Sequence, residues 1–115
     1  MLRVNTLVEK LQLEVVAGAD GLEKEVKGMY VGDLLSWVMA NIRNGNCWIT
    51  IQTHVNVIAV ALLGEASCII IPEKAEIDEA TIEKANIENI PLLRSPLSAY
   101  ELALQFGKLD SDGNQ

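Results

Sequence analysis

The stretch from Cys47 to Leu63, CWITIQTHVNVIAVALL, constrains the fold of this chain more than any other. An apolar run rich in β-branched residues, Trp48-Ile49-Thr50-Ile51, precedes three polar residues and then an apolar segment of helical length. This order predicts a strand, a tight turn and a helix, with Thr53 as the helix N-cap. Because ligands of open α/β sheets usually bind beyond the carboxyl ends of strands, the polar turn marks a candidate binding place.

The second half of the chain repeats this strand-and-helix rhythm twice. A wholly apolar strand over Ser67 to Ile71 precedes a helix from about Asp78 to Ile87, and a strand at Pro91 to Leu93 precedes a helix over Ala99 to about Phe106. Apolar strands without alternation are buried on both faces, and such repeats favour parallel pairing. We therefore predict an α/β fold, a three-layer α/β/α domain with a largely parallel sheet of about five strands.

The last predicted helix has clear start and stop signals. Ser98 and Glu101, three residues apart, form the pattern of a capping box, and Gly107 is the expected stop. Residues 1–107 are therefore expected to form a single domain, and the polar residues 108–115 a flexible C-terminal tail.

The first half of the chain carries weaker patterns. Apolar spacing predicts a helix over Asn5 to Leu11, followed by a short strand over Leu13 to Val16 and a Gly/Asp-rich turn. Glu23 to Tyr30 reads as a strand with Gly28 as a bulge or a close backbone approach. A helix from Leu34 to about Arg43 follows, with Asp33 as its predicted N-cap.

Composition excludes several classes of function. The net charge of −7 argues against nucleic-acid binding, and no apolar run approaches the roughly 20 residues that span a bilayer. The amino terminus does not resemble a signal peptide, so we expect a cytoplasmic protein. Cys47 and Cys68 are expected to be buried thiols, not a disulfide. With one histidine, the chain offers no zinc or iron–sulfur ligand set; we expect no cofactor, although a carboxylate site for Mg²⁺ or Ca²⁺ stays open.

Neutral hydrogen-bonding residues cluster around the central turn and suit recognition of a small ligand. They are Thr50, Gln52, Thr53 and Asn56; the alternative is that they only cap and satisfy backbone groups. Asp33 and His54, the single histidine, are further candidate ligand contacts. To act as a general base, His54 would need a partner such as Asp33; the remaining alternative is that it simply forms the turn. Arg94 and Ser95 end another strand and could hold a phosphate or carboxylate, unless Arg94 pairs with an acidic residue.

The two tryptophans are expected to differ in role. Trp48 should pack beneath the sheet. Trp37 falls between predicted core positions of its helix, so it is a candidate interface residue or a residue at the rim of the core.

Two segments, GLEKEVKGMYVGDLL at 21–35 and WITIQTHVNVIAVA at 48–61, resemble the DRTGG domain family, with similarity from Leu7 to about Leu104. In the family's signature, an acidic-basic pair precedes two glycines. Here Glu23 and Lys24 replace Asp-Arg, Gly28 matches the first glycine and Met29 replaces the second. The signature is therefore degenerate, whereas the later segment matches closely.

The resemblance implies a fold and a kind of function. The family is similar to the amino-terminal domain of HPr kinase/phosphorylase, and it occurs beside CBS domains in regulated pyrophosphatases and in phosphotransacetylase-like proteins. Free-standing copies are often encoded near iron-only hydrogenase genes in anaerobes. The implied role is a non-catalytic regulatory, ligand-sensing or dimer-forming module; the ligand-sensing hypothesis gives it an anionic or nucleotide-like ligand. This chain has no G-x-x-x-x-G-K-[ST] phosphate-binding loop.

Two alternatives stay open from the residues themselves. One is a protein-assembly module without a small-molecule ligand, whose partner face contains Trp37. The other is a small phosphate-ester hydrolase that uses Asp33 and His54.

Overall fold

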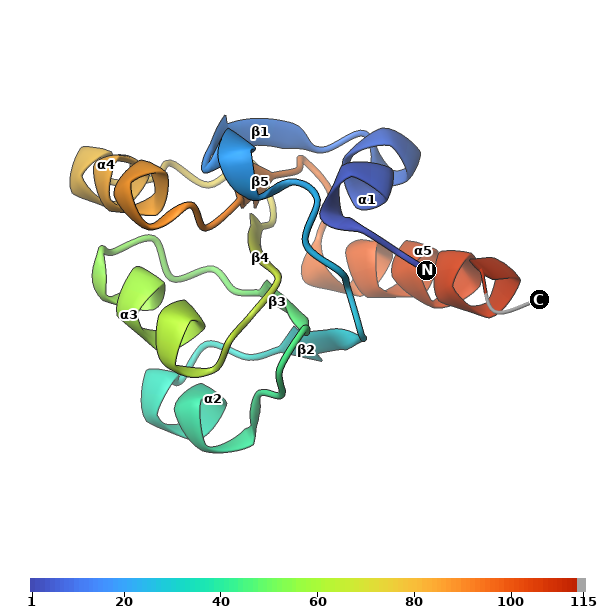
Figure 1. The fold of residues 1–115 in the computed structure, drawn as a ribbon, viewed down its shortest axis with the longest axis horizontal. Helices are drawn as coiled ribbons and strands as arrows, with labels where there is room; N and C mark the ends of the chain where they lie inside the picture. Colours follow the sequence, from blue (N-terminus) through green and yellow to red (C-terminus); the bar gives the residue numbers. More distant parts are fainter. Residues whose placement is uncertain (114–115) are drawn as a thin grey trace.

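The computed structural model describes residues 1–113, with side chains described as far as Leu109, as five helices, a short 3-10 turn and one five-stranded sheet (Figure 1). The elements are α1 (Val4–Leu11), β1 (Glu14–Ala17), η1 (Ala19–Gly21), β2 (Met29–Val31), α2 (Leu35–Asn41), β3 (Cys47–Ile49), α3 (Asn56–Leu63), β4 (Cys68–Ile71), α4 (Glu79–Glu88), β5 (Leu92–Arg94) and α5 (Ala99–Gly113). None of these helices is both long enough and apolar enough to cross a membrane.

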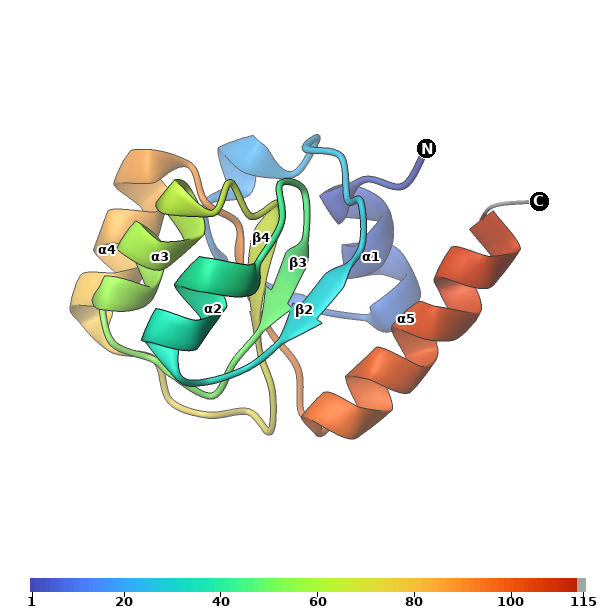
Figure 2. The same cartoon turned by 90° about the horizontal axis from the view of Figure 1, so that it is seen from below.

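The sheet has the order β1-β5-β4-β3-β2. Strands β2 to β5 are mutually parallel, and β1 pairs with β5 in the antiparallel direction. Helices α2, α3 and α4 link the parallel strands and pack side by side on one face, while α1 and α5 cover the other (Figure 2). The predicted three-layer α/β/α architecture with a largely parallel five-stranded sheet is confirmed.

Side chains of the central strands alternate between two apolar clusters. Trp48, Ile69 and Ile71 face α2, α3 and α4, whereas Cys47, Ile49 and Ile70 face α1 and α5. Trp48 is fully buried, as predicted, and its indole N–H donates to the Gly32 carbonyl at 2.9 Å. Both cysteines are also buried, as predicted, and lie opposite each other on β3 and β4.

The strand predicted over Glu23 to Tyr30 is wrong over most of its length, because β2 begins only at Met29. The preceding residues bond to other partners: Val26 N–H donates to Leu2 and Lys27 N–H to Gly45. Gly28 does provide the predicted close approach. Its φ is +140°, and a Cβ there would lie 3.1 Å from Asn46 Nδ2.

Two of the three predicted helix caps are wrong. Leu34 and Val55 occupy the N-cap positions of α2 and α3, without side-chain caps, so neither Asp33 nor Thr53 serves that role. The capping box of α5 is confirmed: Ser98 Oγ accepts from Glu101 N–H at 3.1 Å, and Glu101 Oε1 accepts from Ser98 N–H at 3.0 Å. These bonds favour the carboxylate, so the pKa of Glu101 lies below its ordinary value.

The predicted end of α5 is also wrong, because the helix continues past Gly107 to Gly113. The apolar pattern continues too: Leu109 packs against the same cluster as Phe106. The predicted tail therefore begins as helix, and its last two residues, 114 and 115, lie outside the described part of the chain.

The continuation of α5 predicts that Gly107→Ala stabilises the fold. A Cβ at Gly107 would meet no atom within 4 Å, and alanine in a helix interior is favoured by about 0.5–1 kcal/mol over glycine. Denaturant unfolding measures the change. Gly18→Ala is the opposite control, because Gly18 has φ +72° and its Cβ would overlap the Ile90 carbonyl; it should cost more than ~1 kcal/mol. Destabilisation by Gly107→Ala would instead place a left-handed helix end at this glycine.

Candidate functional site

At the carboxyl edge of the sheet, the structure brings together Asp33, Thr50 and Gln52 from the loops after β2 and β3. Asp33 Oδ1 accepts from the Thr50 hydroxyl and from Ile51 N–H, both at 2.9 Å. Gln52 donates a hydrogen bond to each of the other two residues. Its side-chain amide donates to the Asp33 carbonyl, and its backbone N–H donates to Thr50 Oγ1, each at 3.1 Å. The Asp33 carboxylate therefore ties two loops together, which explains why it does not cap α2.

A second pair of contacts at this edge joins the turn after β3 to α4. His54 Nδ1 lies 2.7 Å from Asp78 Oδ2, and the Thr81 hydroxyl donates to the Thr53 carbonyl at 2.7 Å. The partner of His54 is thus Asp78 and not the predicted Asp33. The imidazole is 71% exposed, so the pair sits in water. Asn56 is exposed on the first turn of α3.

Arg94 and Ser95 lie away from this cluster, because strands β4 and β3 separate β5 from β2. The Arg94 guanidinium donates to both carboxylate oxygens of Glu14, at 3.0 and 3.1 Å, from the neighbouring strand β1. This pairing raises the pKa of Arg94 and lowers that of Glu14. Ser95 is buried, and its hydroxyl accepts from Leu97 N–H. Arg94 ends β5 at the carboxyl edge of the sheet, as expected, but its guanidinium bonds to Glu14, so the alternative of an ion pair with an acidic residue is confirmed.

The strand order also removes the usual reason for a ligand at the carboxyl edge. Open α/β sheets bind ligands where the strand order reverses, because loops there diverge and leave a crevice. Strands β2, β3, β4 and β5 instead follow one another in chain order, with no reversal among them. A hollow of about 600 Å³ beside His54 is lined by Glu76, Asp78 and Glu79 with two isoleucines, which disfavours an anion.

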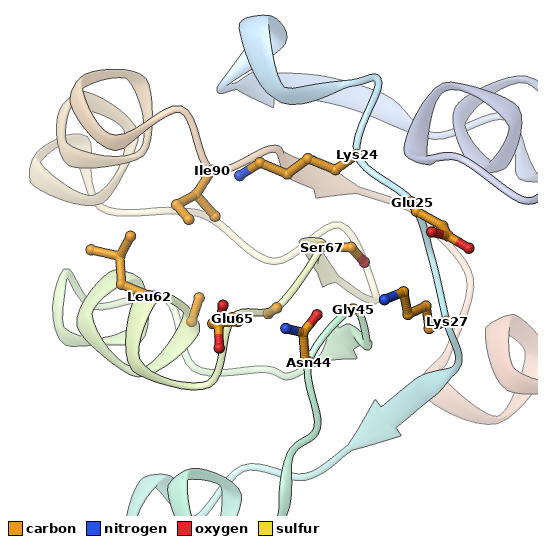
Figure 3. Close-up of a pocket in the computed structure, with 11 residues that line it drawn as sticks. Lys24, Glu25, Lys27, Asn44, Gly45, Leu62, Glu65, Ser67 and Ile90 are labelled. Atoms are coloured by element: carbon orange, nitrogen blue, oxygen red, sulfur yellow. The ribbon is translucent and has the colours of Figure 1, made fainter.

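The amino edge of the same sheet carries a different cavity, of about 400 Å³ (Figure 3). It lies where the chain enters β2, β3, β4 and β5, and the sequence patterns did not point to it. The lining residues are Lys24, Glu25, Lys27, Asn44, Gly45, Ala61, Leu62, Glu65, Ala66, Ser67 and Ile90. Three of them belong to the degenerate signature segment, Glu23 to Met29, which was the only available sequence signal.

The two cavity lysines differ in their surroundings. Lys24 extends along the rim towards Ile90 (Figure 3), and its ammonium donates to the Asn89 carbonyl at 2.9 Å. Partial burial lowers the pKa of Lys24, because desolvation disfavours the charged form. Lys27 extends towards Gly45, whose φ is +84° and whose missing Cβ leaves room for the lysine methylenes. Among the described side chains, neither ammonium has an acidic partner.

Comparison with known proteins gives the class of this chain. A model of the DRTGG domain family matches residues 6–108, so the chain belongs to that family. One similar solved structure contains the CBS and DRTGG domains of the regulatory region of Clostridium perfringens pyrophosphatase, complexed with its activator diadenosine tetraphosphate. It shares the fold with a TM-score of 0.66 at 16% identity, over 86% of this chain and 43% of that one. A comparison with curated proteins found no match.

The Asp33 network predicts a measurable coupling between the loops after β2 and β3. Asp33→Ala and Thr50→Val should each lower the free energy of unfolding by about 1–2 kcal/mol, because partners lose their hydrogen bonds. The double variant should cost less than the sum, with a coupling of about 0.5 kcal/mol or more. Asp20→Ala is the control, since the exposed Asp20 side chain makes no hydrogen bond within the described residues. Simple additivity would contradict the network.

The Glu14–Arg94 pair predicts part of the acid sensitivity. Since the folded state lowers the pKa of Glu14, its contribution is present above the unfolded pKa and is lost as pH falls through the folded pKa. Unfolding followed from about pH 6 to about pH 3 should therefore show a smaller loss of stability for Glu14→Gln than for the native chain. Glu14 is 55% exposed, so the difference is modest and shrinks with added salt. Glu83→Gln, at an exposed glutamate without an ion pair, should match the native pH profile.

Proposed function

We propose that this chain is a non-catalytic regulatory module that works as a homodimer and senses a small anionic, nucleotide-like molecule. Membership of the DRTGG domain family supports a regulatory role, as does the fold shared with part of a pyrophosphatase regulatory region. The activator named for that region, diadenosine tetraphosphate, motivates the class of ligand. The setting we propose is regulation of iron-only hydrogenase or of phosphotransfer in the cytoplasm of anaerobes, which the family resemblance suggests.

The observation that carries the proposal is an uncovered apolar surface at the β2 end of the sheet, which we call the β2 edge surface and define by Val31, Leu34 and Trp37. Within the described residues, β2 pairs with β3 alone, and α2 and α5 flank it without crossing its outer edge (Figure 2). All three side chains are at least half exposed, and Trp37 is 64% exposed. An exposed tryptophan near the unpaired edge of a strand is typical of a protein interface.

A second copy of this chain is the partner that fits this surface. An unpaired strand edge is self-complementary, because a two-fold axis brings the free N–H and C=O groups of one copy opposite those of the other. Leu34, the N-cap residue of α2, and Trp37, in the first turn of that helix, are both exposed, so they would add apolar burial beside the paired edges. A homodimer would therefore hide the exposed strand edge of both copies.

The predicted ligand-binding residues differ in whether their side chains are already hydrogen-bonded within the protein. Asp33, Thr50 and Gln52 bond to one another, and Arg94 and Ser95 bond elsewhere. Thr53 is held through its carbonyl, which leaves His54 and Asn56 as the exposed candidates. The competing function, an assembly module without a ligand, shares the β2 edge surface but predicts no ligand-dependent change in stability.

Substitution of Trp37 tests the homodimer. We expect the native chain to sediment as a dimer and Trp37→Glu to sediment as a folded monomer, because a buried carboxylate would face the partner without compensation. Analytical ultracentrifugation at two protein concentrations measures the mass, and circular dichroism checks the fold. Ile87→Glu is the matched control, since Ile87 is 71% exposed on α4, away from β2; this variant should remain dimeric. A Trp37→Glu dimer of native affinity would rule out this surface, and a native monomer would rule out the homodimer.

A further inference from the structure

Two lysines that have no acidic partner among the described residues line the amino-edge cavity, although the chain as a whole is strongly acidic. The sequence has 16 acidic residues against 9 lysines and arginines, so acidic partners are abundant. The ion pairs of the described residues use His54, Lys84 and Arg94, so most of the lysines and arginines have no acidic partner; Lys24 and Lys27 are distinguished because both line the same hollow. Lysines on an acidic surface that are held without carboxylates remain available for an anion.

Local geometry keeps both ammonium groups at the cavity. Lys24 is held along the rim by one hydrogen bond to the Asn89 carbonyl, which leaves two of its three donors for another acceptor. Gly45 has no Cβ, and one placed there would lie 2.8 Å from Lys27 Cγ, so only glycine allows the Lys27 stem to lie against this backbone. Figure 3 shows Lys27 pointing towards Gly45, whereas the Glu25 carboxylate points away from the centre of the cavity.

The remaining lining offers both hydrogen bonds and apolar contact. Asn44 makes no side-chain hydrogen bond within the described part of the chain, and the Ser67 hydroxyl has only a long contact, 4.0 Å, to Cys68 Sγ. On the side of α3 and α4, Leu62 is 40% exposed and supplies accessible apolar surface, next to the buried Ile90 (Figure 3). This contrasts with the carboxyl edge, where Asp33, Thr50 and Gln52 satisfy one another.

We infer that the amino-edge cavity is a binding site for a nucleotide, with the phosphate groups held by Lys24 and Lys27 and the base against the exposed Leu62. A cavity of about 400 Å³ falls within the range of small-molecule sites, which are mostly apolar with a few placed polar groups. Asn44 and Ser67 supply neutral hydrogen bonds, and the Glu65 carboxylate can accept from ribose hydroxyls or a base amino group. The inference rests on the ligand-sensing part of the proposed function and assigns it a place.

Isothermal titration with ADP, adenosine and inorganic phosphate tests this site. ADP should bind more tightly than adenosine, which lacks the phosphates, and than phosphate, which lacks the apolar body. Lys24→Gln and Lys27→Gln should each weaken ADP binding about tenfold or more, and added salt should weaken it further. Lys108→Gln, an exposed lysine on α5 across the sheet, is the matched control and should bind as the native chain does. Within the described residues the Lys27 side chain makes no hydrogen bond, so Lys27→Gln should keep the native unfolding midpoint.

Any other result would overturn the assignment of the nucleotide site to the amino-edge cavity, and these results can be told apart. Native ADP affinity in both lysine variants would rule out the amino-edge cavity. If His54→Ala abolished that binding, the ligand-sensing module would stand with its site at the carboxyl edge. No binding of any of the three probes would overturn both the nucleotide site and the ligand-sensing part of the proposed function. The homodimer is judged separately, by ultracentrifugation.

Discussion

Burial of β3 and β4 on both faces is the constraint on which the rest of this structure depends. Trp48 and Ile69 point into one apolar cluster, and Cys47, Ile49 and Ile70 into the other. Strands without a polar face require helices above and below, and parallel neighbours require helical crossovers. The polar residues next to β3 and β4 in the chain therefore lie beyond the ends of these strands, and we expect binding chemistry at those two edges of the sheet.

The carboxyl and amino edges of the sheet differ in how their polar side chains are bonded. At the carboxyl edge, Asp33 bonds to Thr50 and Ile51, and His54 bonds to Asp78. The polar side chains of these loops therefore bond to one another and leave few donors or acceptors for a ligand. At the amino edge, Gly28 lies close to the Asn46 side chain and Gly45 close to the Lys27 stem, contacts that a Cβ would crowd. The signature segment of the DRTGG family lies at this second edge, which gives its residues a physical context: Lys24 stands at a cavity rim and Gly28 has a φ that favours glycine.

Sequence patterns predicted the central elements well, because periodicity and burial are local signals. The strand at Cys68–Ile71, the capping box of Ser98 and Glu101, the buried Trp48 and the exposed Trp37 were all foreseeable from neighbouring residues. Contacts that depend on the order of the strands in the sheet could not be predicted from neighbouring residues. Pairing of β1 with β5 brings Glu14 to Arg94, and packing of α4 near the β3 loop brings Asp78 to His54. Asp33 has the residue type of a cap, but tertiary contacts with Thr50 compete for its carboxylate.

Mapping of a nucleotide on the folded chain tests the central claim most directly. Backbone amide resonances would be followed by NMR while ADP is added to the native protein. If the ligand binds at the amino edge, the largest chemical-shift changes fall on Lys24, Gly45, Ser67 and Ile90, and the amide shifts of residues 50–56 change little. Shifts concentrated on Thr53, His54 and Asn56, with Gly45 and Ser67 unchanged, would contradict the account and return the ligand site to the carboxyl edge.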